Sequence, residues 1–100
     1  MKAIWNDHVI AEADKDELIY IEQNWYFPPD SVKQDWLRKS DTPYTCPWKG
    51  ECQYFDVVID GEENKDAAFS YAEPLPTAIE RVHKDFSNYV AFWRGVTVIE

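Results

Sequence analysis

The sequence predicts an all-β fold, and three features of its pattern support this. Apolar residues alternate with polar ones more often than they recur at helical spacing, which is typical of strands with one buried face. Turn-forming pairs such as Asn6-Asp7 and Asp60-Gly61 divide the chain into short segments. Pro28-Pro29 and Pro74 interrupt it further. We expect eight or nine short strands and at most two short helical segments, packed as antiparallel sheets or a barrel.

The first half of the chain divides into six predicted segments. In order, they are a hairpin of two strands, two further strands, one helical turn and a fifth strand: residues 2–5, 8–13, 18–21, 25–27, 32–36 and 37–40. The hairpin turns at Asn6-Asp7, residues that tolerate left-handed backbone. Leu18–Ile21 is apolar on both faces, so we expect it to be buried on both. Pro28-Pro29 ends the fourth strand because proline cannot donate to a ladder, and Asp30-Ser31 can cap the helical turn.

The second half is predicted to contain a structured loop and two more hairpins. Its segments are the loop Thr42–Gly50, the strands Cys52–Ile59 and Lys65–Tyr71, a helical turn at 77–84, and the strands Tyr89–Trp93 and Val96–Ile99. Asp60-Gly61 supplies the turn of the first hairpin, and Arg94-Gly95 that of the last.

The segment Cys52–Ile59 gives the clearest strand pattern. Alternate residues of a strand point to opposite faces. One face carries Phe55, Val57 and Ile59, and the other carries Cys52, Tyr54 and Val58. We expect the first of these faces to lie against a core.

Composition excludes several classes of partner. One hundred residues make one domain, here predicted to span residues 1–100. The formal net charge of −9 argues against nucleic acid, which needs a basic surface, and equally against docking on anionic membranes. No apolar run approaches the roughly 20 residues of a membrane span. The chain begins at Met1, has no signal peptide and contains two cysteines, so we expect a complete, cytoplasmic protein with reduced thiols.

Five short motifs occur in an order and spacing that resemble one known family. They are Tyr26-Phe27-Pro28-Pro29, Thr45-Cys46-Pro47-Trp48-Lys49-Gly50, Asp66-Ala67-Ala68, Tyr71 with Pro74, and Tyr89-Val90-Ala91-Phe92. Together they span essentially the whole chain, which resembles the domain-of-unknown-function family 427, filed under a nucleotidyltransferase label. The resemblance implies a β-tent-like fold, in which two small antiparallel sheets pack at an angle. Phe69 and Ala72 depart from the family pattern, which more often has tryptophan and proline there.

A candidate ligand site centres on Thr45–Gly50. This segment directly precedes the longest predicted strand, so a rigid sheet would present it, as is usual for functional loops. Small-molecule sites are usually lined by apolar and aromatic side chains with a few polar groups. The candidate lining residues are Thr45, Cys46, Trp48, Lys49, Tyr54, Asp66, Phe69 and Tyr71. We expect Trp48 or Tyr54 at the lining and Lys49 at the mouth. The alternative is that the rings are ordinary core and that Lys49 extends into water.

Cysteine and acidic residues leave a catalytic alternative open. Cys46 is a candidate for a nucleophile or redox centre, because the Lys49 ammonium can lower the pKa of a nearby thiol; its alternative role is packing. Lys49 and Asp66 are candidates for nucleotidyl-type transfer, although the sequence has neither a glycine-rich phosphate loop nor a recognisable magnesium motif. No Cys-x-x-Cys pair is present to hold zinc. We therefore predict no metal site and no cofactor.

The residues favour a binding module over an enzyme. The main hypothesis is a pocket for a small polar or cationic molecule, or for a peptide side chain. The alternatives are an enzyme that uses Cys46, or Lys49 with Asp66, and an interaction domain that dimerises through exposed aromatic residues. Binding ranks first because the sequence gives no evidence of a nucleophile–base pair and no metal-ligand cluster. We expect an unknown small molecule as partner and a monomer or homodimer as the assembly.

Overall fold

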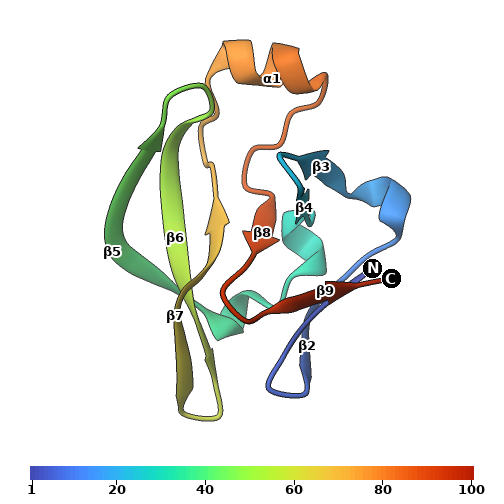
Figure 1. Ribbon diagram of the computed structural model, residues 1–100, viewed down its shortest axis with the longest axis vertical. Helices are drawn as coiled ribbons and strands as arrows, with labels where there is room; N and C mark the ends of the chain where they lie inside the picture. The colour runs from blue at the N-terminus through green and yellow to red at the C-terminus, as the bar shows by residue number, and fades with distance from the viewer.

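The computed structural model describes all residues from Met1 to Glu100 and confirms the all-β class (Figure 1). The strands are β1 (Lys2–Trp5), β2 (His8–Glu12), β3 (Ile19–Ile21), β4 (Asn24–Tyr26), β5 (Leu37–Cys46), β6 (Gly50–Ile59), β7 (Glu62–Ser70), β8 (Val90–Phe92) and β9 (Thr97–Ile99). One α-helix, α1 (Pro76–Val82), follows β7, and three 3-10 turns lie at Lys15–Glu17, Pro29–Ser31 and Gln34–Trp36. Two helical segments were expected at most, and the additional ones are single turns between strands. None of the helices is long and apolar enough to cross a membrane.

The nine strands form three antiparallel sheets, where two were predicted. The largest sheet has the order β5-β6-β7-β8, the second has the order β2-β1-β9, and β3 pairs only with β4. An isolated bridge between Phe27 and Val90 joins the end of the small β3–β4 hairpin to the largest sheet. Figure 1 accordingly shows β4 beside β8. The third sheet is separate because β3 and β4, each three residues long, form ladder hydrogen bonds only with each other.

The predicted C-terminal hairpin is wrong, because β8 and β9 belong to different sheets. β8 pairs with β7, whereas β9 pairs with β1. Between them, Arg94 and Gly95 have φ values of 49° and 94°, and the turn that they form redirects the chain from one sheet to the other. The pairing of β9 with β1 brings the two ends of the chain side by side (Figure 1).

The segment Thr42–Gly50, predicted as a loop, is mostly strand. β5 continues to Cys46, only Pro47–Lys49 forms a turn, and β6 follows directly. Pro43 favoured the loop prediction because proline lacks a backbone N–H. β5 tolerates it because β5 is an edge strand, and its pairing with β6 is irregular between Lys39 and Pro43.

Two smaller expectations are also corrected, and one is confirmed. The helical turn predicted at Val32–Trp36 divides into two 3-10 turns on either side of Val32, which is extended and bridges to Ala11. The third strand is not buried on both faces, because Tyr20 is 54% exposed. The N-terminal hairpin forms as predicted, with both of its turn residues at positive φ.

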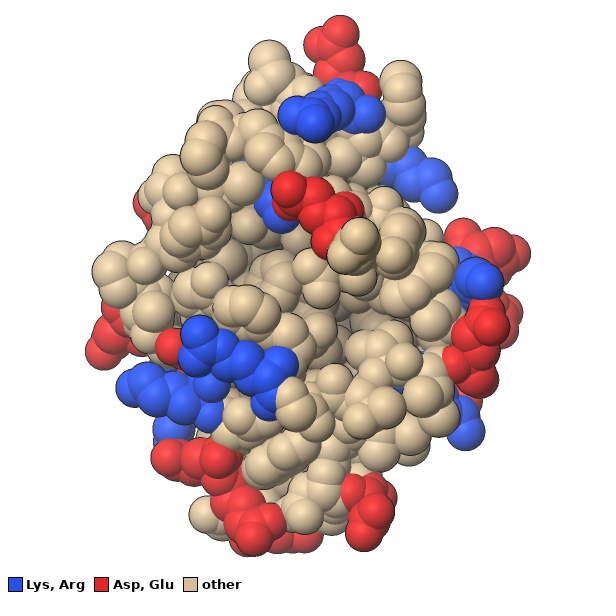
Figure 2. All heavy atoms as spheres, in the orientation of Figure 1, with Lys and Arg blue, Asp and Glu red and all other residues tan.

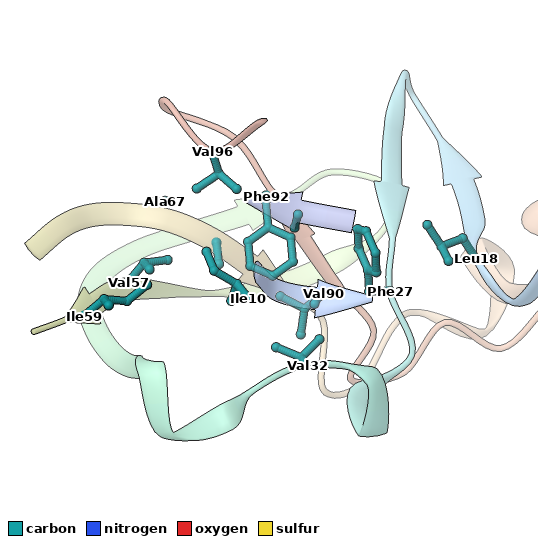
Figure 3. Close-up of a cluster of buried hydrophobic side chains, with 13 residues drawn as sticks. Ile10, Leu18, Phe27, Val32, Val57, Ile59, Ala67, Val90, Phe92 and Val96 are labelled. Atoms are coloured by element: carbon teal, nitrogen blue, oxygen red, sulfur yellow. The ribbon is translucent and has the colours of Figure 1, made fainter. Parts of the chain in front are cut away.

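β6 lies between two buried clusters and contributes to both. The main core joins the two larger sheets (Figure 3) and consists of Ala3, Ile10, Ala11, Leu18, Phe27, Val32, Val57, Ile59, Ala67, Ala68, Val90, Phe92 and Val96. The second cluster consists of Ile19, Ile21, Tyr26, Cys46, Cys52, Phe69, Tyr71, Ala78, Phe86 and Ala91. Phe55 packs on the main core beside Val57 and Ile59, whereas Tyr54 packs on the second cluster beside Cys52. The alternation along this strand therefore predicted its two faces correctly for these five residues, whereas Val58, expected beside Cys52 and Tyr54, belongs to neither cluster.

Candidate functional site

A pocket of about 470 Å³ opens beside the second cluster. Its walls come from the β3–β4 turn, from the β5–β6 hairpin and from residues at the ends of β7 and β8. Figure 2 shows a face of the molecule that is hollowed and largely uncharged at its centre, with most charged groups toward its edges.

The structure brings six of the eight predicted site residues together at this pocket: Cys46, Trp48, Lys49, Tyr54, Phe69 and Tyr71. The other two lie outside its lining. Thr45 is exposed, because it alternates with Cys46 along β5 and points to the opposite face. Asp66 is buried, its Oδ2 accepts a hydrogen bond from Thr42 (2.7 Å), and its backbone N–H donates to Asp56 Oδ1 (2.9 Å). Asp66 therefore does not share one pocket with Lys49, as the nucleotidyl-transfer hypothesis requires.

Lys49 is unusual among the site residues because its charge is buried. Only 5% of the residue is exposed. Its Nζ lies 2.6 Å from Glu22 Oε1 and 3.4 Å from the hydroxyl of Tyr26. The same atom lies 5.9, 5.5 and 5.1 Å from the ring centroids of Tyr26, Trp48 and Tyr71, within the range of cation–π attraction. The expectation of a lysine at the mouth is thus wrong: Lys49 is in the wall, where three rings and one carboxylate replace water.

A close approach of two chain segments directs Lys49 inward. The backbone N–H of Leu75 donates to the carbonyl of Lys49 (2.9 Å). The next residue, Gly50, has a φ of 111°, and a Cβ at this position would lie 3.4 Å from Leu75 Cγ and 3.5 Å from the carbonyl of Glu73. Glycine suits this position because it adopts positive φ without steric cost and leaves room for the neighbouring chain. The segment before α1 therefore holds the β5–β6 turn in place.

Glu22 reaches Lys49 from the turn between β3 and β4. Glu22 and Gln23 have φ values of 50° and 69°, as the two central residues of a tight hairpin turn require. The Glu22 carboxylate accepts from two donors, because Trp48 Nε1 also lies 3.4 Å from its Oε2. The hydrogen bond from Lys49 holds the pKa of Glu22 below its usual range. Glu22 is therefore a carboxylate at neutral pH.

Tyr54 is at the centre of the opposite, aromatic wall. Its ring is nearly parallel to that of Trp93, at an interplanar angle of 7° and a centroid distance of 6.1 Å. Phe69 and Tyr44 lie 6.2 and 6.4 Å away on other sides. Trp93 is fixed by a hydrogen bond from Nε1 to the carbonyl of Asp66 (2.6 Å). Burial raises the pKa of Tyr54, so its hydroxyl is neutral and this wall adds no charge to the pocket.

The two cysteines line the pocket as free, buried thiols. Cys46 and Cys52 are 5% and 7% exposed. Burial raises the pKa of Cys52. Burial also raises the pKa of Tyr71. Cys52 is therefore a neutral thiol at neutral pH, and such a residue packs as a small hydrophobic group.

Six residues of the lining were missed by the sequence analysis: Glu22, Asn24, Tyr44, Pro47, Cys52 and Trp93. For Tyr44 a signal was present, because a strand through Cys46 would have placed both residues on the face that Cys52 and Tyr54 share. Glu22 also left a signal in the sequence. Asparagine and glycine are the usual residues of a two-residue hairpin turn, so a glutamate at such a position is unusual. Trp93 left none, because its place depends on the change of sheet after β8.

One group of side chains has the proximity that a metal ion needs. Ligand oxygens of Asp14, Asp16 and Glu17 all lie within 4.8 Å of one another. Oxygen ligands of this kind suit hard cations. All three residues are exposed, and none of them lines the pocket. The site at Lys49 thus has no carboxylate cluster of its own.

Comparison with known proteins relates the chain to one family. Residues 1–99 match the family model NTP_transf_9, which is described as a domain of unknown function (DUF427). No curated protein matches the chain. Because the family model covers almost every residue, the chain belongs to the DUF427 family, as its five motifs predicted.

Proposed function

We propose that this domain binds a small molecule in the pocket between the β3–β4 turn and the β5–β6 hairpin. The observation that supports the proposal is the buried Lys49 ammonium, paired with the half-exposed Glu22 carboxylate, at a cavity with aromatic walls. Small-molecule sites combine apolar walls with a few well-placed polar groups, in cavities of about 300–1,000 Å³. The pocket, at about 470 Å³, has this size and this lining.

Stability alone does not account for a lysine at this position. Taking an ammonium group out of water costs several kcal/mol, and replacing a buried ion pair by apolar residues is often neutral or stabilising. Three aromatic rings surround Lys49, so a hydrophobic residue would pack against them, and the half-exposed Glu22 would then be solvated by water. A buried charge that is retained beside a cavity favours a role in binding.

The backbone at Glu22 supports the same conclusion. The left-handed conformation costs a residue with a side chain about 1–2 kcal/mol. Glu22 and Gln23 both adopt it, in a turn where glycine would avoid the cost. Strained residues of this kind are concentrated at functional sites. We infer that the glutamate is kept for its carboxylate, which reaches the pocket.

Binding is favoured over catalysis by the groups that surround the two cysteines. Cys52 is a neutral thiol, whereas the thiolate is the reactive form. Neither histidine lines the pocket, so no imidazole base is placed next to Cys46. Asp66, the acid that the nucleotidyl-transfer hypothesis needs, lies outside the lining.

Two exposed tyrosines provide a matched test. Tyr44, which is 46% exposed, lines the pocket, whereas Tyr20, which is 54% exposed, does not. A library of small aromatic compounds is screened by thermal shift, since a ligand of the folded state raises the melting temperature. The affinity of each hit is then measured by calorimetry. We expect Tyr44→Ala to weaken binding about tenfold, equivalent to about 1.4 kcal/mol, and Tyr20→Ala to leave affinity unchanged.

Two results would contradict the proposal. One is a library in which no compound raises the melting temperature. The other is a set of hits whose affinity is the same for the wild-type chain, Tyr44→Ala and Tyr20→Ala, because such compounds bind elsewhere.

A further inference from the structure

We propose that the ligand of this pocket is a flat aromatic anion, whose carboxylate or phosphate replaces the Glu22 carboxylate at Lys49 and Trp48. This inference rests on the binding function proposed above and specifies its ligand. It also differs from the cationic ligand that the aromatic residues suggested at first.

The pocket lining does not share the acidic excess of the whole chain. Lys49 lines the pocket, whereas Arg81 and Arg94 lie outside the lining, with their guanidinium carbons 4.5 Å from the Trp48 ring and 4.6 Å from the Trp93 ring. Glu22 is the one acidic residue in the lining. One positive and one negative group give the lining a net charge of zero, in a chain with a net charge of −9, so a ligand that displaces Glu22 meets the positive charge of Lys49. Figure 2 shows both basic and acidic groups at the rim of the hollow.

The Glu22 carboxylate shows what the two donors of the pocket accommodate. Lys49 Nζ contacts Oε1 and Trp48 Nε1 faces Oε2, so neighbouring residues address the two oxygens of one acid group. Hydrogen bonds from a charged donor to a carboxylate are about twice as strong as neutral ones. A carboxylate or phosphate from a ligand presents the same arrangement of oxygens.

Glu22 is suited to leave when such a ligand arrives. Its side chain is 53% exposed, whereas that of Lys49 is 7% exposed. On leaving, the glutamate moves into water and recovers its hydration, while the lysine keeps an anionic partner. The exchange therefore never leaves Lys49 as an uncompensated buried charge, which is the costly state of a broken buried pair.

The rest of the pocket fits a flat ring and disfavours a cation. Tyr54, Phe69 and Trp93 form a continuous aromatic wall next to the polar groups. A cationic ligand in the place of the Glu22 carboxylate would lie next to the Lys49 ammonium, which repels it. Asp66, whose backbone carbonyl accepts a hydrogen bond from Trp93, does not line the pocket, and its carboxylate accepts a hydrogen bond from Thr42.

The test uses one ring system with four different groups. The affinities of 1-naphthoate, 1-naphthyl phosphate, 1-naphthamide and 1-naphthylmethylammonium for the full chain are measured by calorimetry. We expect at least one anion to bind about tenfold or more tightly than the neutral amide, as charged hydrogen bonds are the stronger, and the ammonium compound to bind weakest. The ratio between the two anions distinguishes a carboxylate ligand from a phosphate ligand.

Variants then test the exchange at Lys49. Glu22→Gln removes the competing charge, so the anions should bind severalfold more tightly, whereas a cationic ligand would bind less tightly. Lys49→Met should abolish the preference for anions. Lys33→Met is the matched control, because Lys33 also stacks on a tryptophan, 4.8 Å from the Trp36 ring, but lies outside this pocket. If Lys49→Met does not fold, the change in anion affinity caused by Glu22→Gln tests the proposal alone: tighter binding supports an anionic ligand and weaker binding contradicts it.

The outcomes separate this inference from the function on which it rests. Equal or tighter binding of the amide or the ammonium compound, or weaker anion binding by Glu22→Gln, would overturn the anionic ligand and leave a binding pocket. Failure of all four compounds to bind, together with a library in which no compound raises the melting temperature, would overturn both.

Discussion

Lys49 and Glu22 form one ion pair, but they depend on it to different degrees. Lys49 is enclosed by three aromatic rings, and Glu22 is the only charged partner that it has. Glu22 lies half in water, where a carboxylate is well solvated without a partner. Loss of the glutamate therefore leaves a buried ammonium group uncompensated, which is strongly destabilising compared with loss of an exposed ion pair.

The pH dependence of stability follows from this pair. The folded-state pKa of Glu22 is lowered from 4.5 by its hydrogen bond with Lys49. A carboxylate with a lowered folded-state pKa contributes stability above its unfolded pKa, and this contribution is lost as the pH falls through the folded value. We expect the wild-type chain to be more stable than Glu22→Gln at neutral pH and the difference to shrink as the pH falls below 4.5.

Urea unfolding of both proteins across this pH range measures the effect. Glu12→Gln is the control, because Glu12 forms an exposed pair with Lys2 at 3.9 Å, and such pairs contribute little. A stability difference between the wild-type chain and Glu22→Gln that stays constant from neutral to acidic pH would show that the pair does not titrate as described.

At the level of elements, the β3–β4 hairpin positions the carboxylate. The hairpin has two strands of three residues and belongs to neither of the larger sheets. Its turn is a two-residue turn in which both residues have positive φ. The short strands leave little freedom in the register, so the side chain of the first turn residue is presented to the β5–β6 turn.

The two turn residues are predicted to respond differently to glycine. Gln23→Gly should stabilise the protein by up to about 1 kcal/mol, because glycine adopts positive φ without the cost that a side chain imposes. Glu22→Gly relieves the same strain, but it removes the partner of Lys49 and should destabilise. Thermal unfolding of both variants compares these effects. Two equal and stabilising changes would mean that the carboxylate does not matter for Lys49.

At the level of the whole molecule, the two faces of β6 have different roles, one in the stability of the fold and the other in the proposed binding. Its one face is part of the main core, and its other face lines the pocket through Cys52 and Tyr54. The main core connects the two larger sheets, whereas the second cluster connects the pocket to α1 through Ala78. Mutations on the two faces of this single strand should therefore have separable effects.

A substitution in the main core tests this division. Val57 is fully buried there and does not line the pocket. Val57→Ala should cost about 2 kcal/mol of unfolding free energy, from the lost apolar contacts and the cavity that remains. The affinity of any pocket ligand should stay the same at temperatures where the variant is folded. Calorimetry on the variant checks this, and a clear loss of affinity would show that the two faces are coupled.

Local patterns predicted those parts of the fold that depend on neighbouring residues. The N-terminal hairpin and the two faces of β6 follow from turn chemistry and from alternation, which short segments carry in full. The β8–β9 hairpin was wrong because strand partners are chosen by the packing of distant segments. The same alternation of apolar and polar residues is compatible with β8 paired to β9 and with each of them paired to a different strand.

The candidate site was predicted in part for the same physical reason. Cys46, Trp48 and Lys49 are consecutive or nearly so, and a resemblance to known motifs drew attention to them. Glu22 comes to Lys49 only because the β3–β4 hairpin packs next to the β5–β6 turn, a contact that no local pattern encodes. The sequence analysis therefore also missed the burial of Lys49, because a buried lysine is expected only where its counter-charge is known.

The five tryptophans are divided between the two halves of the molecule. Trp5, Trp25 and Trp36 pack against the main core, whereas Trp48 and Trp93 line the pocket. An arginine stacks on the indole ring of each of these two pocket tryptophans, and Trp48 Nε1 also faces the Glu22 carboxylate. Indole fluorescence responds to nearby charge and to displaced water, so the pocket carries its own optical reporter. Replacing the three core tryptophans by phenylalanine would leave an emission that reports occupancy of the pocket alone, without an attached dye.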